Sequence, residues 1–126
     1  MENYKYSKEH EWVKVESDEV VLIGISLHAA ETLGDIVFVE LPEIDDSIQQ
    51  FEKMGEIESV KAVSDLFSPI TGKVLEVNTE LIDQPEKINE SAETSGWMIK
   101  VVLSDSSELE NLMSESEYLH FVENEE

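Results

Sequence analysis

The residue around which chemistry could be organised in this sequence is Lys61, in the stretch ESVKAVSD at residues 58–65. The side-chain types that usually supply nucleophiles or metal ligands are scarce, with no cysteine and three histidines. No Ser-His-Asp grouping, Gly-rich phosphate loop or histidine pair at metal spacing is recognisable. Val60 before the lysine, with Ala62 and Val63 after it, predicts two short strands that meet at Lys61. A lysine at such a hairpin tip is solvated and reachable, although this alone does not distinguish it from an ordinary surface charge.

Short strands that could position this lysine run through most of the sequence. Alternating apolar and polar side chains predict strands at 10–16, 19–25, 35–41, 54–60, 62–67, 73–78 and 97–103. The first two are expected to form a hairpin around Ser17 and Asp18. The period changes at 26–34, which predicts a short helix capped by Ser26 and ended by Gly34. Residues 79–96 are polar and are expected to be irregular, with one helical turn.

The C-terminal region, about 106–122, is expected to be helical. Both SELE at 107–110 and SESE at 114–117 match the capping-box pattern at a helix start. The sequence therefore predicts a single domain over 1–126 that is mainly β. Its expected form is a flattened β-barrel or sandwich with a short internal helix and a docked C-terminal helix.

The charge of the chain limits its partners. Thirty acidic residues against eight basic ones, all of them lysine, give a net charge of −22. Such a surface repels phosphate backbones and anionic membrane surfaces, so neither nucleic acid nor membrane is an expected partner. It favours partners with basic surfaces. The start, MENYKYSKEHEWV, resembles neither a signal nor a transit peptide, which predicts a bacterial cytoplasmic protein, or a mitochondrial one only if a transit peptide has been removed.

The sequence around Lys61 closely resembles the lipoyl-attachment segment of the glycine cleavage system H proteins. The resemblance rests on ESVKAVSDLFSPITGKVLEVN, and on KYSKEHEWV, IGIS, LGDIVFVELPE, SGWMIKV and ELENLMSESEY in the family's order and spacing. It covers roughly residues 4–122. Biotin carriers usually have Met-Lys-Met at this tip, and lipoyl domains of 2-oxoacid dehydrogenases have Asp-Lys-Ala. The resemblance implies a barrel-sandwich hybrid fold of the biotinyl/lipoyl carrier type, with a lipoyl hairpin at about 55–68 and lipoic acid in amide linkage to Lys61.

A non-catalytic carrier function is what the resemblance implies. The lipoyl arm would take the aminomethyl group of glycine from a pyridoxal-phosphate-dependent glycine decarboxylase (P protein) to an aminomethyltransferase (T protein). Dihydrolipoamide dehydrogenase (L protein) would reoxidise the arm, and a lipoate ligase or a lipoyl/octanoyl transferase would attach it. An alternative of another class is an H-like lipoyl donor or relay protein in protein lipoylation, which would use the same lysine. An independent enzyme, such as a small hydrolase, would need a reactive constellation that the sequence lacks.

The resemblance also implies roles for the residues near the lysine. The residues expected to be recognised around the attachment lysine are Glu58, Ser59, Val60 and Ala62. Glu11 and Asp65, with Glu9, are expected to form a cleft that shelters the loaded arm, because a carboxylate is a suitable partner for a protonated amine.

Five positions depart from the family pattern. Glu9 stands where serine is frequent and Thr32 where some members have histidine. Phe51 replaces a usual turn glycine, Lys53 a common proline, and Glu56 an apolar or small residue. Because a Cβ atom resists positive φ, Phe51 is expected to reshape its turn.

Overall fold

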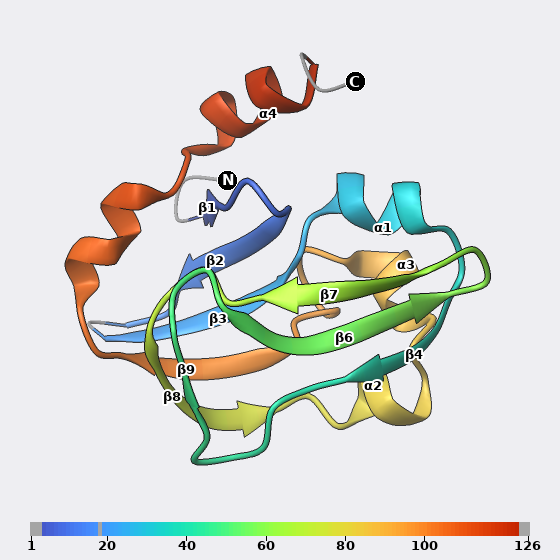
Figure 1. Ribbon diagram of the computed structural model, residues 1–126, viewed down its shortest axis with the longest axis horizontal. Helices are drawn as coiled ribbons and strands as arrows, with labels where there is room; N and C mark the ends of the chain where they lie inside the picture. The colour runs from blue at the N-terminus through green and yellow to red at the C-terminus, as the bar shows by residue number, and fades with distance from the viewer. Residues whose placement is uncertain (1–3, 18, 124–126) are drawn as a thin grey trace.

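Two antiparallel β-sheets form the body of the protein in the computed structural model, which describes residues 4–17 and 19–123 (Figure 1). The first sheet has the strand order β1-β2-β3-β9-β8-β5. Its strands are β1 (Tyr4–Tyr6), β2 (Glu11–Val15), β3 (Val20–Ile25), β9 (Ile99–Leu103), β8 (Gly72–Val77) and β5 (Ser47–Ile48). The second sheet has the order β4-β6-β7, from β4 (Ile36–Glu40), β6 (Lys53–Ser59) and β7 (Val63–Phe67). Every strand run predicted from the alternation is present, which confirms the mainly β architecture. The turn residue Asp18 lies outside the described residues.

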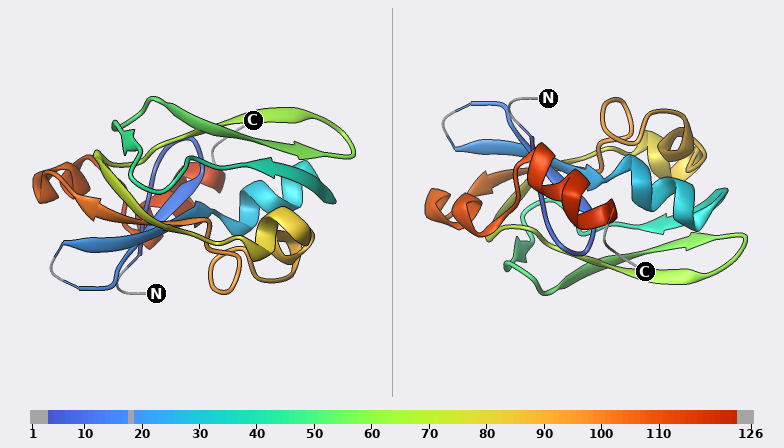
Figure 2. Two further views of the ribbon diagram at one scale, coloured as in Figure 1. Left: turned by 90° about the horizontal axis from the view of Figure 1, so that it is seen from below. Right: turned by 90° about the horizontal axis from the view of Figure 1, so that it is seen from above.

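The hydrophobic core lies between the two sheets, which Figure 2 shows as separate layers. Apolar side chains alternate inward along the strands, as expected for strands with one buried face. Residues of both sheets are buried in it, including Val13, Ile23, Ile57, Leu66 and Ile99. No helix in the part of the chain that the structure describes is long and apolar enough to span a membrane.

Short helices close the ends of the layers. Helix α1 (Leu27–Leu33) begins and ends as predicted, because the Ser26 hydroxyl accepts the Ala29 amide and Gly34 ends the helix at φ 85°. The segment 79–96 was expected to be irregular with one helical turn, and this expectation is corrected. It contains two helices, α2 (Glu80–Asp83) and α3 (Lys87–Ser91). Each helix buries one large apolar side chain, Leu81 in α2 and Ile88 in α3, so neither has enough apolar residues to show a period in the sequence.

The C-terminal region contains one of the two predicted capping boxes. The Ser114 hydroxyl accepts the Glu117 amide at 3.2 Å, and the Glu117 carboxylate accepts the Ser114 amide at 2.8 Å, at the start of α4 (Glu115–Glu123). The prediction of a second capping box at 107–110 is wrong. The segment is a 3₁₀ helix, η1 (Ser106–Asn111), whose N-cap is the Asp105 carboxylate.

Aromatic side chains dock α4 on the six-stranded sheet. The Tyr6 and Tyr118 rings stack with centroids 4.4 Å apart, beside buried Tyr4 and Trp12. The Tyr118 hydroxyl lies 2.7 Å from both His10 Nδ1 and Ser26 Oγ. These contacts give the expected docked C-terminal helix a specific orientation, because a buried hydroxyl requires hydrogen-bond partners.

The turn before β6 adopts positive φ despite its side chain. Phe51 has φ 68°, and its amide donates to the Ser68 carbonyl at 2.6 Å. The expected reshaping to avoid positive φ is therefore wrong: the chain retains a left-handed residue there and accepts the Cβ strain. The Phe51 side chain is 51% exposed, so burial offsets little of this cost.

Replacing Phe51 by glycine and by alanine separates the backbone strain from the side-chain contacts. Both variants lose the ring, but only glycine relieves the positive φ. We expect Phe51→Gly to be more stable than Phe51→Ala, with a free energy of unfolding about 1 kcal/mol higher. Urea denaturation of both variants measures this difference. Equal stabilities would show that φ 68° costs nothing here.

Candidate functional site

The turn that carries Lys61 is built by one buried serine. Residues 60–62 join β6 to β7, and the Ser59 amide donates to the Ala62 carbonyl at 2.8 Å. The Ser59 hydroxyl accepts the amides of Lys61 at 3.1 Å and Ala62 at 3.2 Å. Ser59 is 5% exposed, so the acceptor of these partly buried bonds lies on the inner side of the turn. The side chain of Ser59 therefore holds the backbone on which Lys61 stands.

Two further contacts fix the tip against the neighbouring elements. The Val60 amide donates to the Asp35 carbonyl at 3.0 Å, which ties the turn to the residue before β4. The aliphatic stem of Lys61 passes over Gly34, at the end of α1, where an added Cβ would lie 3.3 Å from Lys61 Cε. Lys61 is exposed, and among the residues placed by the structure none forms an ion pair with it. The backbone at the tip is thus held while the ammonium group stays accessible.

The predicted recognition residues divide into two kinds. Glu58, Val60 and Ala62 are exposed around Lys61, with Val60 exposed over 68% of its surface. Ser59 is buried, so a partner protein can sense it only through the shape of the turn. Alternation in the strand places Glu58 outward and Ser59 inward, and this follows from the sequence once the strand register is known.

Glu11 is a buried carboxyl that joins the two sheets. It is 2% exposed at the start of β2, and its Oε2 accepts the amide of Phe67, at the end of β7, at 3.1 Å. Its Oε1 accepts the Ser7 hydroxyl at 2.6 Å. Burial raises the pKa of Glu11 to about 8, against the opposite effect of these hydrogen bonds. Burial therefore favours the neutral form of this carboxyl, which bridges the two sheets through its hydrogen bonds.

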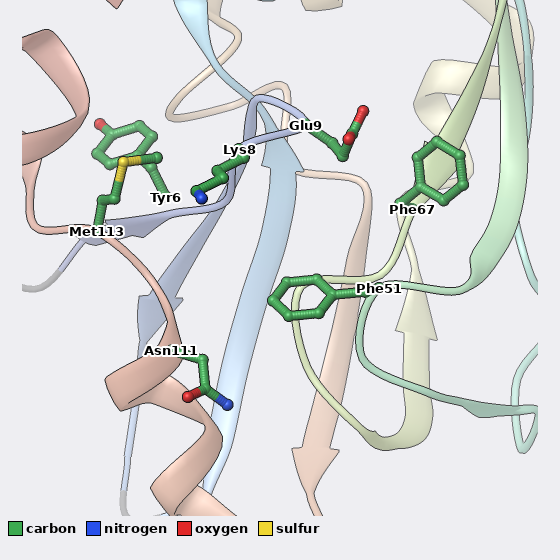
Figure 3. Close-up of a pocket in the computed structure, with 7 residues that line it drawn as sticks. All are labelled: Tyr6, Lys8, Glu9, Phe51, Phe67, Asn111 and Met113. Carbon is green, nitrogen blue, oxygen red and sulfur yellow. The ribbon is translucent and has the colours of Figure 1, made fainter. Parts of the chain in front are cut away.

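A cavity of about 340 Å³ lies near this bridge, between the loop before β2 and the C-terminal region (Figure 3). Phe51 and Phe67 lie on one side and Tyr6 and Met113 on the other, and the cavity's remaining lining residues are Lys8, Glu9 and Asn111. Aromatic and thioether walls with a few polar groups are typical of sites for small organic groups. Of the three residues predicted to shelter the arm, Glu9 lines this cavity.

Asp65 lies elsewhere, in a cluster with two of the residues that depart from the family pattern. The Lys53 ammonium is 2.7 Å from Glu56 Oε2 and 3.3 Å from Asp65 Oδ1, and these hydrogen bonds raise the pKa of Lys53. The structure therefore separates the predicted trio into a cavity residue, a buried bridge and an ion-paired carboxylate. In the described segments no group of three or more His, Cys, Asp or Glu side chains could hold a metal ion.

The functional contacts that sequence reasoning missed are long-range ones. The Glu11–Phe67 bond joins residues 56 positions apart, and the Lys53–Asp65 pair depends on the pairing of β6 with β7. The one available signal was the simultaneous change to Lys53 and Glu56, which places opposite charges three residues apart.

Replacing Glu11 by glutamine tests the buried carboxyl. A raised folded-state pKa contributes stability that is complete below the unfolded pKa of about 4.5 and is lost as pH rises through about 8. A neutral amide of the same shape does not titrate. We therefore expect the free energy of unfolding of the original protein to fall, relative to that of Glu11→Gln, by about 1 kcal/mol for each pH unit between pH 5 and 8. Parallel denaturation curves across this range measure it. A constant difference between the two proteins would contradict the raised pKa.

Comparisons with known proteins agree with this geometry. The family model described as Glycine cleavage H-protein matches residues 4–125. A glycine cleavage system H protein of Staphylococcus saprophyticus is 58% identical over 118 residues, 94% of this chain and 93% of the relative. One from Vibrio vulnificus is 54% identical over 119 residues, 94% of each chain. The crystal structure of a glycine cleavage system H protein from Mycobacterium marinum superposes with a TM-score of 0.86 at 34% identity, covering 98% of both chains. This chain belongs to the glycine cleavage H-protein family.

Proposed function

We propose that this protein is the lipoyl carrier of a glycine cleavage system, with Lys61 as the attachment residue. The observation that carries the proposal is the tip of the β6–β7 hairpin, where Ser59 and Asp35 hold the backbone while the Lys61 ammonium remains accessible. An attachment residue needs both properties. A fixed backbone presents the amine in one place to the attaching enzyme, and an open side chain lets the arm enter other proteins.

Formation of the lipoyl amide removes the charge of Lys61. The amine nitrogen bonds to the activated carboxyl carbon of lipoate, and the leaving group on that carbon departs. A bound lipoyl group would supply a disulfide that accepts the aminomethyl group and two electrons. The chain's own contribution is positional: Ser59 sets the turn, and the bare Cα of Gly34 leaves room for the lysine stem.

The acidic residues near the hairpin suit different tasks in sheltering the loaded arm. Glu9, at the cavity, and Asp65, on β7, are exposed carboxylates that suit a protonated amine. Glu11 suits this role less, because it is 2% exposed and both of its oxygens already accept hydrogen bonds within the fold. Its proposed part is to hold the end of β7 through the Phe67 amide.

The partners follow from the proposed reaction. They are the pyridoxal-phosphate-dependent glycine decarboxylase, the aminomethyltransferase, dihydrolipoamide dehydrogenase and an enzyme that attaches the lipoyl group. The bond-breaking chemistry belongs to these enzymes and to the lipoyl group. The carrier raises the effective concentration of its arm at each active site to which it docks.

Lys61→Arg should abolish attachment without changing the charge of the tip. A guanidinium does not form the lipoyl amide, whereas each of the other lysines remains available as a control. Intact mass spectrometry after incubation with lipoate, ATP and a lipoate ligase should show one lipoyl increment on the original protein and none on the variant. An increment that persists in Lys61→Arg would place the attachment site elsewhere.

Ser59→Ala should slow attachment at Lys61. The variant removes the acceptor of two buried amide hydrogen bonds, which loosens the turn by an amount on the order of 1–2 kcal/mol. We expect kcat/KM of the ligase for the carrier to fall by about ten-fold. Ser64→Ala, on the exposed part of β7, is the matched control. Equal rates for the two variants would show that the shape of the turn does not matter to the enzyme.

Glycine–bicarbonate exchange tests the carrier role itself. With glycine decarboxylase, the lipoylated protein should support exchange of labelled bicarbonate into the carboxyl group of glycine, and the Lys61→Arg variant should not. Complete lipoylation without any exchange would contradict the glycine-cleavage role. That outcome would favour a lipoyl donor in protein lipoylation, which uses the same lysine.

A further inference from the structure

The three-stranded sheet has an uncovered face beside Lys61, which we call the outer face: Phe38, Glu40, Glu56, Glu58, Val63 and Asp65. Strand register aligns its members in two rows. Glu56 lies opposite Glu40 on β4 and opposite Asp65 on β7. One step nearer the tip, Glu58 lies opposite Phe38 and Val63. Side chains directly opposite one another, and residues two apart on a strand, share a face of the sheet.

The row nearer the tip is apolar on both sides of Glu58. Phe38 is 51% exposed and Val63 is 61% exposed, and Val60 follows on the turn itself. Single exposed apolar residues are ordinary on a protein surface. Here three exposed apolar residues lie beside the exposed Lys61, two of them on the outer face and one on the turn. They form a patch of the kind that mediates contacts between proteins.

The second row keeps a net negative charge although Lys53 forms ion pairs with two of its carboxylates. Its three carboxylates, those of Glu40, Glu56 and Asp65, lie directly across from one another, and like charges in this arrangement destabilise a sheet. Lys53 contacts Glu56 and Asp65, which leaves a net charge of −2 on the row. The sheet thus holds an acidic strip immediately behind the apolar patch, one step further from the hairpin tip. Figure 1 shows β4, β6 and β7 side by side in this sheet.

We propose that glycine decarboxylase docks on the outer face. In this complex, apolar side chains of the decarboxylase contact Phe38, Val60 and Val63, and its basic side chains contact the acidic row. This inference rests on the proposed function. For Lys61 to carry its arm into an active site, the rim of that site must meet the surface around the hairpin tip. The exposed side chains there include those of the outer face and of the turn.

The chemistry of the decarboxylase matches the charge of the acidic row. Its cofactor carries a phosphate and its substrate a carboxylate, and both are bound in proteins by lysine, arginine and oriented amides. Such cationic groups would give the entrance of the active site a positive potential, which would attract an acidic surface and accelerate docking. Because the oxidised arm has no charge, this attraction must come from the surface of the carrier.

The double variant Glu40→Gln/Glu56→Gln tests the acidic row while leaving Lys61, Glu58 and Asp65 in place. Both proteins are lipoylated to completion, as shown by intact mass, before glycine–bicarbonate exchange is measured over a range of carrier concentrations. At about 0.01 M salt, where the screening length is about 30 Å, we expect the KM for the variant to be about ten-fold higher. At about 0.15 M salt, where the screening length is about 8 Å, the difference should shrink.

A matched control removes the same charge from other elements. Glu76 on β8 and Glu110 on η1 are exposed acids outside the outer face, so Glu76→Gln/Glu110→Gln should behave as the original protein does at both salt concentrations. Equal KM values for the two double variants would overturn the docking proposal, since net charge alone would then explain the effect. So would a defect confined to lipoylation or to the aminomethyltransferase step.

The apolar contacts proposed for Phe38, Val60 and Val63 have a separate test. Val63→Thr keeps the shape and the strand preference of the residue while adding a hydroxyl to the patch. We expect kcat/KM for the carrier to fall about five-fold with an unchanged salt dependence, whereas Leu75→Thr, at an exposed apolar position on β8 of the other sheet, should have no effect. Exchange by Val63→Thr at the original rate would overturn the apolar part of the proposal. Absence of exchange with the unaltered lipoylated protein would instead refute the proposed function.

Discussion

The hydrogen bonds accepted by the Ser59 hydroxyl are the constraint on which the hairpin tip depends. A three-residue connection between strands leaves amides without sheet partners, and here the buried hydroxyl accepts those of Lys61 and Ala62. The Asp35 carbonyl accepts a third, from Val60. The backbone of the tip is therefore held to the folded sheet, while the lysine side chain extends from it exposed. This separation between a fixed backbone and a free arm suits a carrier that must present one amine to several enzymes.

The acidic composition acquires a spatial meaning in the structure. A net charge of −22 could serve solubility alone, but the acids have distinct environments. Glu11 is buried as a bridge between the sheets and its pKa is raised by that burial, whereas Glu40, Glu56 and Asp65 share one row of the outer sheet face. Lys53, further along β6, contacts two of these carboxylates and limits their repulsion without cancelling their charge.

Local patterns predicted the local structure, and long-range contacts lay beyond them. Alternation gave the long strands and the hairpin at Lys61, and Ser26 and Gly34 gave both ends of α1. The two-residue strand β5 is too short to show a period. The ion pairs of Lys53 and the positive φ of Phe51 depend on strand pairing and on the packing of turns, which periodicity does not encode. The sequence resemblance located Lys61, and the structure supplied the reason that its backbone is held.

As the proposed attachment residue, Lys61 would carry the one-carbon unit of glycine on its lipoyl arm. Lipoylated protein mixed with glycine and glycine decarboxylase, without the aminomethyltransferase, isolates the loading step. Mass spectrometry of the peptide that spans the β6–β7 hairpin then reports what the arm holds. We expect an aminomethyl increment on lipoyl-Lys61 that depends on glycine. A decarboxylase that loads free lipoamide but leaves the Lys61 arm unchanged would contradict it.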